Sequence, residues 1–186
     1  DTVLERPTKG IPFSFTYMYS SAIALSSRAG DGIQPNVMTS GWRHKYEMRM
    51  IPTQSSIERN ILMSDGSIET WIREGDTYRT RHKEYRGKLT TIANGYYLDY
   101  IFETPDHIKY YFYDPTYVEL PWEAQRKGRL YRVEDYSGNK VQILWNSFAG
   151  VIDKITDTAG GEYIFTYDSK NNLTKVSFGQ WEVNFK

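Results

Sequence analysis

The sequence contains no cysteine in its 186 residues, which excludes both a disulfide framework and a thiolate zinc site. It also contains no apolar run close to the ~18 residues that a membrane-spanning helix needs, so we expect no membrane span. Lysine and arginine together number 23, as do aspartate and glutamate, and this balance does not favour binding to nucleic acid or to an anionic membrane.

Little in the sequence suggests a metal, a cofactor or an active site. The histidines, His44, His82 and His107, are scattered and have no helical i, i+4 spacing, so no metal site is predicted. There is no glycine-rich phosphate loop and no nucleophile-elbow motif, and we therefore expect no cofactor, no catalytic residue and no enzyme activity. Because the chain begins at Asp1 without a methionine or a signal peptide, we expect a processed product or a piece of a longer protein.

Aromatic and turn-forming residues are abundant instead. The 16 Tyr, 8 Phe and 5 Trp favour strands. The Asp-Gly pair at 65–66 predicts the turn of a hairpin formed by Glu58–Met63 and Ser67–Arg73. Tyr96–Glu103 and His107–Tyr113 form a second well-patterned pair of strands. The sequence therefore predicts an all-β fold, a meander of antiparallel β-hairpins with little or no helix.

Three further segments complete this interpretation. Phe13–Tyr17 alternates as a strand, and a strand that starts at Trp42 is expected to end at Pro52, because proline cannot donate to a sheet. Leu120–Lys127 is the one candidate for a short helix, with proline at its first turn, although eight residues also suit a loop.

The last third of the chain repeats itself with a shift of 22 residues, which aligns 130–145 with 152–167. In this alignment, Val141, Ile143 and Trp145 correspond to Tyr163, Phe165 and Tyr167. Large residues at every second position lie on one face of a strand, and the glycines at 138 and 160 suit tight turns. The repeat therefore predicts stacked hairpins, each too small to bury its apolar face alone.

The second copy closely resembles the tyrosine-aspartate (YD) repeat of Rhs proteins, through Ile155–Gly160 and Phe165–Val176. The first copy departs from that repeat, with Trp145-Asn146 in place of Tyr-Asp. Upstream, Ser40–Glu47 looks like the Gly-Trp-x-His-x-Tyr signature near the start of Rhs core regions, so the resemblance covers about residues 41–178. Within this resemblance we assign structural roles in the repeats to Trp42, Asp135, Gly138, Trp145, Asp157, Gly160, Tyr167 and Asp168.

The resemblance to the Rhs/YD-repeat family implies a fold and a function. The chain would be one arc of a spiralling β-sheet, a non-catalytic structural segment of a shell that encloses or presents a toxin or other C-terminal cargo. Its partners would be the remainder of a longer Rhs-type chain or the cargo, and its location would be secreted or cell-surface in a bacterium. The family's aspartyl autocleavage region and a recognisable toxin are missing from this sequence.

We expect three segments along the chain: an irregular leader at 1–40 with one strand, an Rhs core-like meander at 41–128, and YD-type repeats at 129–186. Trp181–Phe185 alternates as a final strand. If it lies at the edge of the sheet, its unpaired backbone groups favour self-association or pairing with a partner strand.

Two alternative functions remain open. Tyr97, Tyr111 and Tyr113 alternate away from the apolar face, and rings displayed on a sheet stack on sugars or on a partner protein, unless other strands cover them. They would make the protein a carbohydrate- or protein-binding β-domain with a glycan or cell-surface partner. The third reading is a hydrolase that uses Asp135 and Asp157 as paired carboxylates. Asp at these positions is, however, typical of the turn itself, as it is at Asp168.

Overall fold

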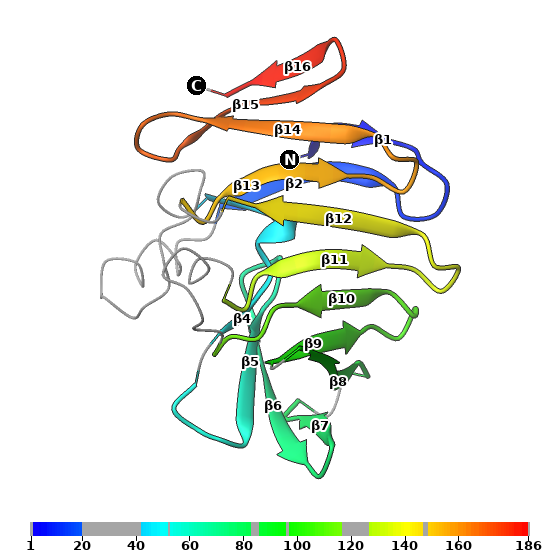
Figure 1. Ribbon diagram of the computed structural model, residues 1–186, viewed down its shortest axis with the longest axis vertical. Coiled ribbons are helices and arrows are strands. Elements are labelled where there is room, and N and C mark those ends of the chain that lie inside the picture. The colour runs from blue at the N-terminus through cyan, green and yellow to red at the C-terminus, as the bar shows by residue number, and fades with distance from the viewer. Residues whose placement is uncertain are drawn as a thin grey trace.

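The computed structural model describes residues 2–19, 42–51, 53–82, 86–95, 97–116, 127–146 and 149–185. These residues form two antiparallel sheets, one of three strands and one of thirteen (Figure 1). In the large sheet each strand pairs with the next one along the chain, in the order β16 to β4. The predicted all-β meander of hairpins is therefore confirmed. No helix of the described residues is long and apolar enough to cross a membrane.

The small sheet consists of β1 (Thr2–Arg6), β2 (Phe13–Tyr19) and β3 (Trp42–His44). The large sheet consists of β4 (Arg49–Ile51), β5 (Glu58–Leu62), β6 (Ile68–Glu74), β7 (Thr77–Thr80), β8 (Lys88–Asn94), β9 (Tyr97–Glu103), β10 (Lys109–Phe112), β11 (Leu130–Glu134), β12 (Lys140–Trp145), β13 (Ile152–Thr156), β14 (Glu162–Tyr167), β15 (Leu173–Phe178) and β16 (Trp181–Asn184).

The single strand predicted from Trp42 to Pro52 is wrong. A 3-10 turn over Lys45–Glu47 (η1) separates β3 from β4, and the two strands belong to different sheets. His44 closes this turn, because its Nδ1 accepts from the backbone N–H of Tyr46 at 3.2 Å while Glu47 accepts from the His44 N–H. The His and Tyr of the Rhs-like signature thus move the chain from one sheet to the other. The side chain of Trp42 lies outside the described part of the structure, as do residues 120–126 of the candidate helix.

The repeat appears in space as a hairpin that carries the same irregularity each time. A β-bulge interrupts the pairing of β12 with β13 between Leu144 and Trp145, and that of β14 with β15 between Thr166 and Tyr167. Bulges increase local twist, so their recurrence bends the sheet by the same device at each step. The burial pattern also recurs, since β11 and β13 both bury their first and fourth residues, and β12 and β14 both bury their second and fourth.

The structure adds an earlier copy that the sequence did not reveal. β10 pairs with β11 through a bulge between Tyr111 and Phe112, which places Phe112 where the later copies have Trp145 and Tyr167. Sequence alignment misses this copy because 17 residues separate Phe112 from Leu130 in this hairpin, whereas six separate Trp145 from Ile152. The ring of Trp145 contacts this earlier hairpin, since the Trp145 Nε1–H donates to the Leu130 carbonyl at 2.7 Å.

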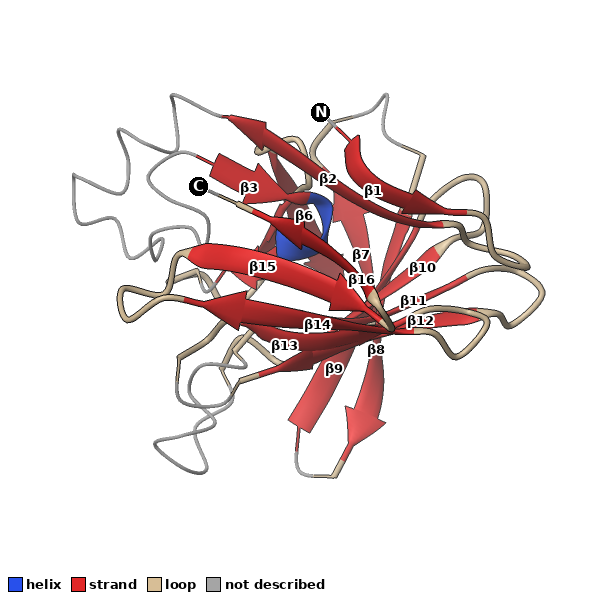
Figure 2. Ribbon diagram, turned by 90° about the horizontal axis from the view of Figure 1, so that it is seen from above, coloured by secondary structure: helices blue, strands red, loops and turns tan. Residues whose placement is uncertain are grey.

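The core runs along the large sheet from β4 to β15, and part of it lies between the repeats and the small sheet, which covers one side of β13–β16 (Figure 2). Phe13 stacks on Tyr163 with ring centroids 3.5 Å apart, and Phe15 meets Phe165 edge-on at 5.5 Å. The leader thus holds two strands, one more than predicted, and its aromatic residues fill the face that the repeats leave apolar. Burial of such rings is a large favourable contribution to folding.

Substitution of Gly160 can test the backbone geometry of the repeat turns. It has φ +80°, and Asn171 occupies the equivalent position of the next turn with φ +62°. We expect Gly160→Val to lower the free energy of unfolding by about 1–2 kcal/mol, because a β-branched residue is strained at positive φ. Gly160→Asn should cost well under half as much, and chemical denaturation of both variants measures the difference. Equal losses for the two variants would contradict this account, since no atom lies within 4 Å of the added Cβ.

Candidate functional site

Three turns of the repeats share one carboxylate-closed geometry. In the turns that begin at Asp135, Asp157 and Asp168, the first residue donates its N–H to the fifth residue's carbonyl, at 3.1, 2.9 and 2.9 Å. The Asp side chain closes each loop from inside, because its Oδ1 accepts from the backbone N–H groups of the third and fifth residues. The Asp residues therefore recur because the turn recurs.

Engagement of these carboxylates argues against the hydrolase reading. In the Asp135 and Asp168 turns the fifth residue is Asn, whose side-chain amide donates to the second carboxylate oxygen at 2.8 and 2.9 Å. The hydrogen bond from the Asn amide is the main cause, together with those from backbone N–H groups, that lowers the pKa of both Asp135 and Asp168 below the usual value. A general acid needs its pKa raised instead, so the geometry favours the structural role predicted for these residues.

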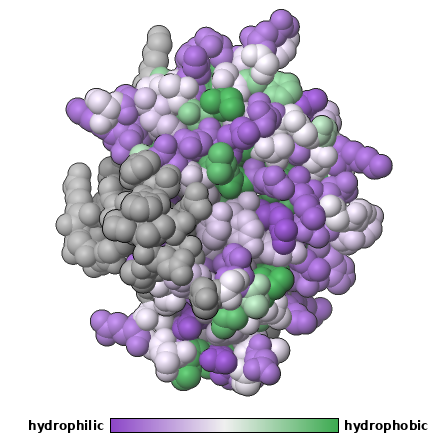
Figure 3. All heavy atoms as spheres, viewed as in Figure 1, coloured by the Kyte–Doolittle hydropathy of each residue, from purple (hydrophilic) through white to green (hydrophobic). Residues whose placement is uncertain are grey.

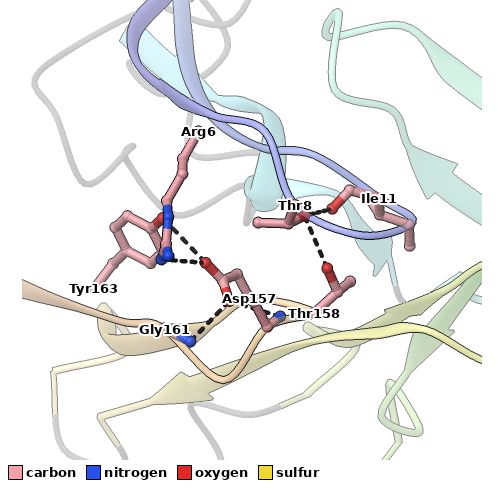
Figure 4. Close-up of polar contacts among 8 residues, drawn as sticks. Arg6, Thr8, Ile11, Asp157, Thr158, Gly161 and Tyr163 are labelled. Carbon is pink, nitrogen blue, oxygen red and sulfur yellow. Dashed lines mark hydrogen bonds and ion pairs between the residues drawn. The ribbon is translucent and has the colours of Figure 1, made fainter.

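Asp157 differs from its two counterparts because it also holds the leader. The fifth residue of its turn is Gly161, so no amide side chain reaches Oδ2. Arg6 of β1 fills that place with an ion pair of 3.2 Å, and the hydroxyl of Tyr163 donates to the same oxygen at 3.2 Å (Figure 4). The Asp157 side chain is fully buried, so this charge depends on Arg6 for compensation.

The surroundings of Asp157 show why Gly161 is needed there. A Cβ on Gly161 would lie 2.7 Å from Asp157 Oδ2 and 2.8 Å from the Phe178 ring, and closer still to the Arg6 guanidinium. Arg6 also stacks over Phe178 at 4.5 Å. A second contact joins the same two segments, because the Thr158 hydroxyl donates to that of Thr8 at 2.8 Å (Figure 4). We call Arg6, Thr8, Asp157, Thr158 and Tyr163 the leader clamp.

The three tyrosines of the binding alternative lie at the same region of the sheet but are not displayed alike. Tyr111 is buried, with the Arg132 guanidinium 3.6 Å above its ring. Tyr113 is half-buried and stacks on Tyr131 at 4.5 Å, while Tyr97 is also half-buried. The structure thus brings Tyr111 and Tyr113 together around Tyr131, a residue that sequence reasoning missed. The bulge puts Tyr131 and Arg132, both half-buried, beside the same tyrosines, so period-two alternation alone could not find them.

Two buried carboxylates underlie this tyrosine cluster. Asp99 accepts from the Asn94 amide at 2.7 Å and from the Tyr131 hydroxyl at 3.1 Å. Burial raises the pKa of Asp99, and it likewise raises that of Tyr131. Asp114 is held by the backbone N–H and hydroxyl of Thr116, at 2.7 and 2.6 Å. The Asp99 bonds tie β9 to the end of β8 and to β11, and those of Asp114 hold the turn after β10, so both carboxylates have a structural role.

The three histidines lie apart in the described residues. His44 is buried in the 3-10 turn, whereas exposed His82 and His107 contact Glu69 and Glu103, each at 3.0 Å. No cluster of three or more potential metal ligands occurs within the described ranges.

Comparison of the sequence with models of known protein families gives no match, and comparison with curated proteins gives none.

The leader clamp can be tested by converting the Asp157 turn to the form of its neighbours. We expect Gly161→Asn to displace Arg6, because the new amide would occupy the place of the guanidinium. The free energy of unfolding should fall by at least about 1 kcal/mol, with faster amide hydrogen exchange in β1. The reverse change at the equivalent position, Asn172→Gly, should leave β1 exchange unaltered. Unchanged protection of β1 in Gly161→Asn would rule out the clamp.

The hydrogen bond from the Asn139 side-chain amide to Asp135 can be tested through the pKa of Asp135. We expect Asn139→Ala to raise the pKa of Asp135 toward the usual value of about 3.9, while that of Asp168 stays low. A carboxyl whose pKa is depressed by folding stabilises the protein above its unfolded pKa, and this contribution disappears as the pH falls through the folded pKa. The variant should therefore lose less stability on acidification than the wild type does. Carbon-13 NMR titration of both carboxyls checks this, and an unmoved Asp135 would refute it.

Proposed function

We propose that the chain is a non-catalytic structural segment of a β-shell like that of Rhs/YD-repeat proteins, which encloses or presents a toxin or other C-terminal cargo. In this proposal the protein acts by steric exclusion, and it belongs to a bacterial secreted or cell-surface assembly. Its partners are the remainder of a longer chain of the same kind, or that chain's cargo.

The observation that carries this proposal is the repetition of one bulged hairpin in a continuous sheet. The pairs β10 with β11, β12 with β13, and β14 with β15 each contain the same bulge, and each hairpin joins the preceding one by a regular antiparallel pairing. Further hairpins of the same kind can therefore extend the sheet through the same two types of strand pairing. Stacked repeats of this kind suit long enclosing surfaces.

The two faces of the repeats differ in the way a shell requires. The inner face carries the buried rings of Trp145, Tyr163 and Phe165, whereas the face seen in Figure 3 shows hydrophobic residues only in small groups among hydrophilic ones. In this segment the small sheet occupies the inner face, so the space for cargo would be lined by further repeats rather than by β13–β16. The described segment then corresponds to a filled end of the shell.

β16 is the strand to which a further repeat would add. It ends the order of the large sheet, and Trp181 is 68% exposed on it. The N–H of Phe185 donates to the Thr174 carbonyl at 2.8 Å, and bonded pairs alternate along an antiparallel ladder. The backbone groups of Trp181 and Val183 therefore face β15, while those of Glu182 and Asn184 face the open edge.

This alternation allows a matched pair of proline variants. If β16 accepts a further strand, the isolated chain should associate as its concentration rises, because its edge would pair with another copy. Asn184→Pro should abolish the association and leave the melting temperature within a few degrees, since it removes only an outward N–H. Val183→Pro should lower the stability by about 1 kcal/mol or more, because it removes a bond to β15. Analytical ultracentrifugation and thermal melts report both effects, and a wild-type chain that stays monomeric at all concentrations would contradict this role of β16.

The proposal that the chain is part of a longer shell can be tested by sequencing the gene beyond this segment. The DNA that follows the codon for Lys186 should encode more copies of the 22-residue unit and then an unrelated tail. An unrelated domain directly after this codon would argue against the proposal.

A further inference from the structure

A groove lies at one end of the hairpins, where three loops meet. It has a volume of about 680 Å³ and is lined by the β1–β2 loop, the β9–β10 turn and the β11–β12 turn. These loops lie at the same edge of the molecule, on the right in Figure 1. Ile11, Pro12 and Ile108 give it apolar surface, and Asp106, Ser137 and Asn139 add polar groups.

An aromatic ring stands exposed at this groove without a role in the turn that carries it. Tyr136 is 84% exposed and occupies the second position of the Asp135 turn. The equivalent residues of the other two turns are Thr158 and Ser169, which have the same backbone hydrogen bonds around them. The turn therefore does not require an aromatic residue, and the ring at this one turn needs another explanation.

The groove is rigid at the base of the ring. Asp135 is fixed by two backbone N–H groups and the Asn139 amide, each at 2.8–2.9 Å. Gly10 of the leader, with φ +87°, packs so closely on this pair that a Cβ there would lie 2.6 Å from Asp135 Oδ2 and from Asn139 Cγ. A site whose groups are already ordered loses little conformational entropy on binding.

The charges of the groove select among possible ligands. Asp106 and Asp135 are acidic, and Lys9 is the one basic residue that lines it. Asp106 is exposed and makes no hydrogen bond or ion pair with any described residue, and Asp135 Oδ2 retains an acceptor position. Two carboxylates disfavour phosphates, nucleic acids and acidic sugars. The loops offer no strand edge for the backbone of a peptide.

We propose that this groove binds an uncharged carbohydrate, which stacks the C–H face of a pyranose on Tyr136 and directs hydroxyl groups to Asp106, Ser137 and Asn139. A pyranose combines an apolar face with a rim of groups that both donate and accept, which matches one exposed ring among mixed polar residues. This binding does not depend on the shell proposed above. It also moves the sugar-binding alternative from the half-buried Tyr97 and Tyr113 to an exposed tyrosine.

The test uses the full chain and four neutral hexasaccharides, namely cellohexaose, maltohexaose, chitohexaose and mannohexaose. NMR titration of the labelled protein should show saturable shifts of the amides of Gly10, Ser137 and Gly138 with at least one of them. Tyr136→Thr copies the residue of the neighbouring turn, so the fold should be retained, and binding should weaken about tenfold or more. Tyr136→Phe should retain most of the affinity.

Trp181→Thr provides the control, because it removes another exposed aromatic residue at a distant strand. It should leave binding unchanged. Three results would overturn the proposal: absence of saturable binding for all four sugars, equal affinity of wild type and Tyr136→Thr, or preference for a heparin hexasaccharide over the neutral ones.

Discussion

The fold depends on a turn that fixes register through a carboxylate. Side chains in a strand alternate, so a slip of one residue would move every buried ring of a hairpin to the solvent. The turns at Asp135, Asp157 and Asp168 prevent this slip, because each Asp holds two backbone N–H groups and so sets the loop at five residues. Asn146 lies midway between Asp135 and Asp157, so the four residues Asp135, Asn146, Asp157 and Asp168 are each 11 positions apart.

The inner face created by this register is the one that the leader fills. Phe13 and Phe15 pack on the rings of β14, and Arg6 satisfies the one turn carboxylate that is buried. A single change from the repeat pattern, glycine in place of asparagine at 161, makes room for that arginine. The repeats therefore contain both the turn geometry by which hairpins are added and the one altered turn, at Gly161, to which the leader is anchored.

Local patterns in the sequence predicted much of this structure. Alternation and turn-forming residues predicted the hairpins of β5 with β6, β9 with β10 and β11 to β15, because strand periodicity and turn chemistry act between neighbours. The partnership of the leader with β14 could not be predicted, since residues 6 and 157 meet only through tertiary packing. The role of Tyr131 and the earlier copy of the repeat at β10 could not be predicted either, because a bulge and a long connection interrupt the sequence period there. Tyr136 was visible in the alignment as the one aromatic residue at its turn position, but its exposure required the fold.

The pairing of β7 with β8 has a mechanical consequence for the large sheet. Among the described residues these strands share one backbone pair, Tyr78 with Leu89. The two halves of the sheet are joined again at β4, where the Met50 N–H donates to the Gly128 carbonyl at 2.7 Å and Arg49 pairs with Arg129. This second attachment braces the junction that the β7–β8 pair leaves weak, so a load applied across the sheet is shared between two points far apart in the chain.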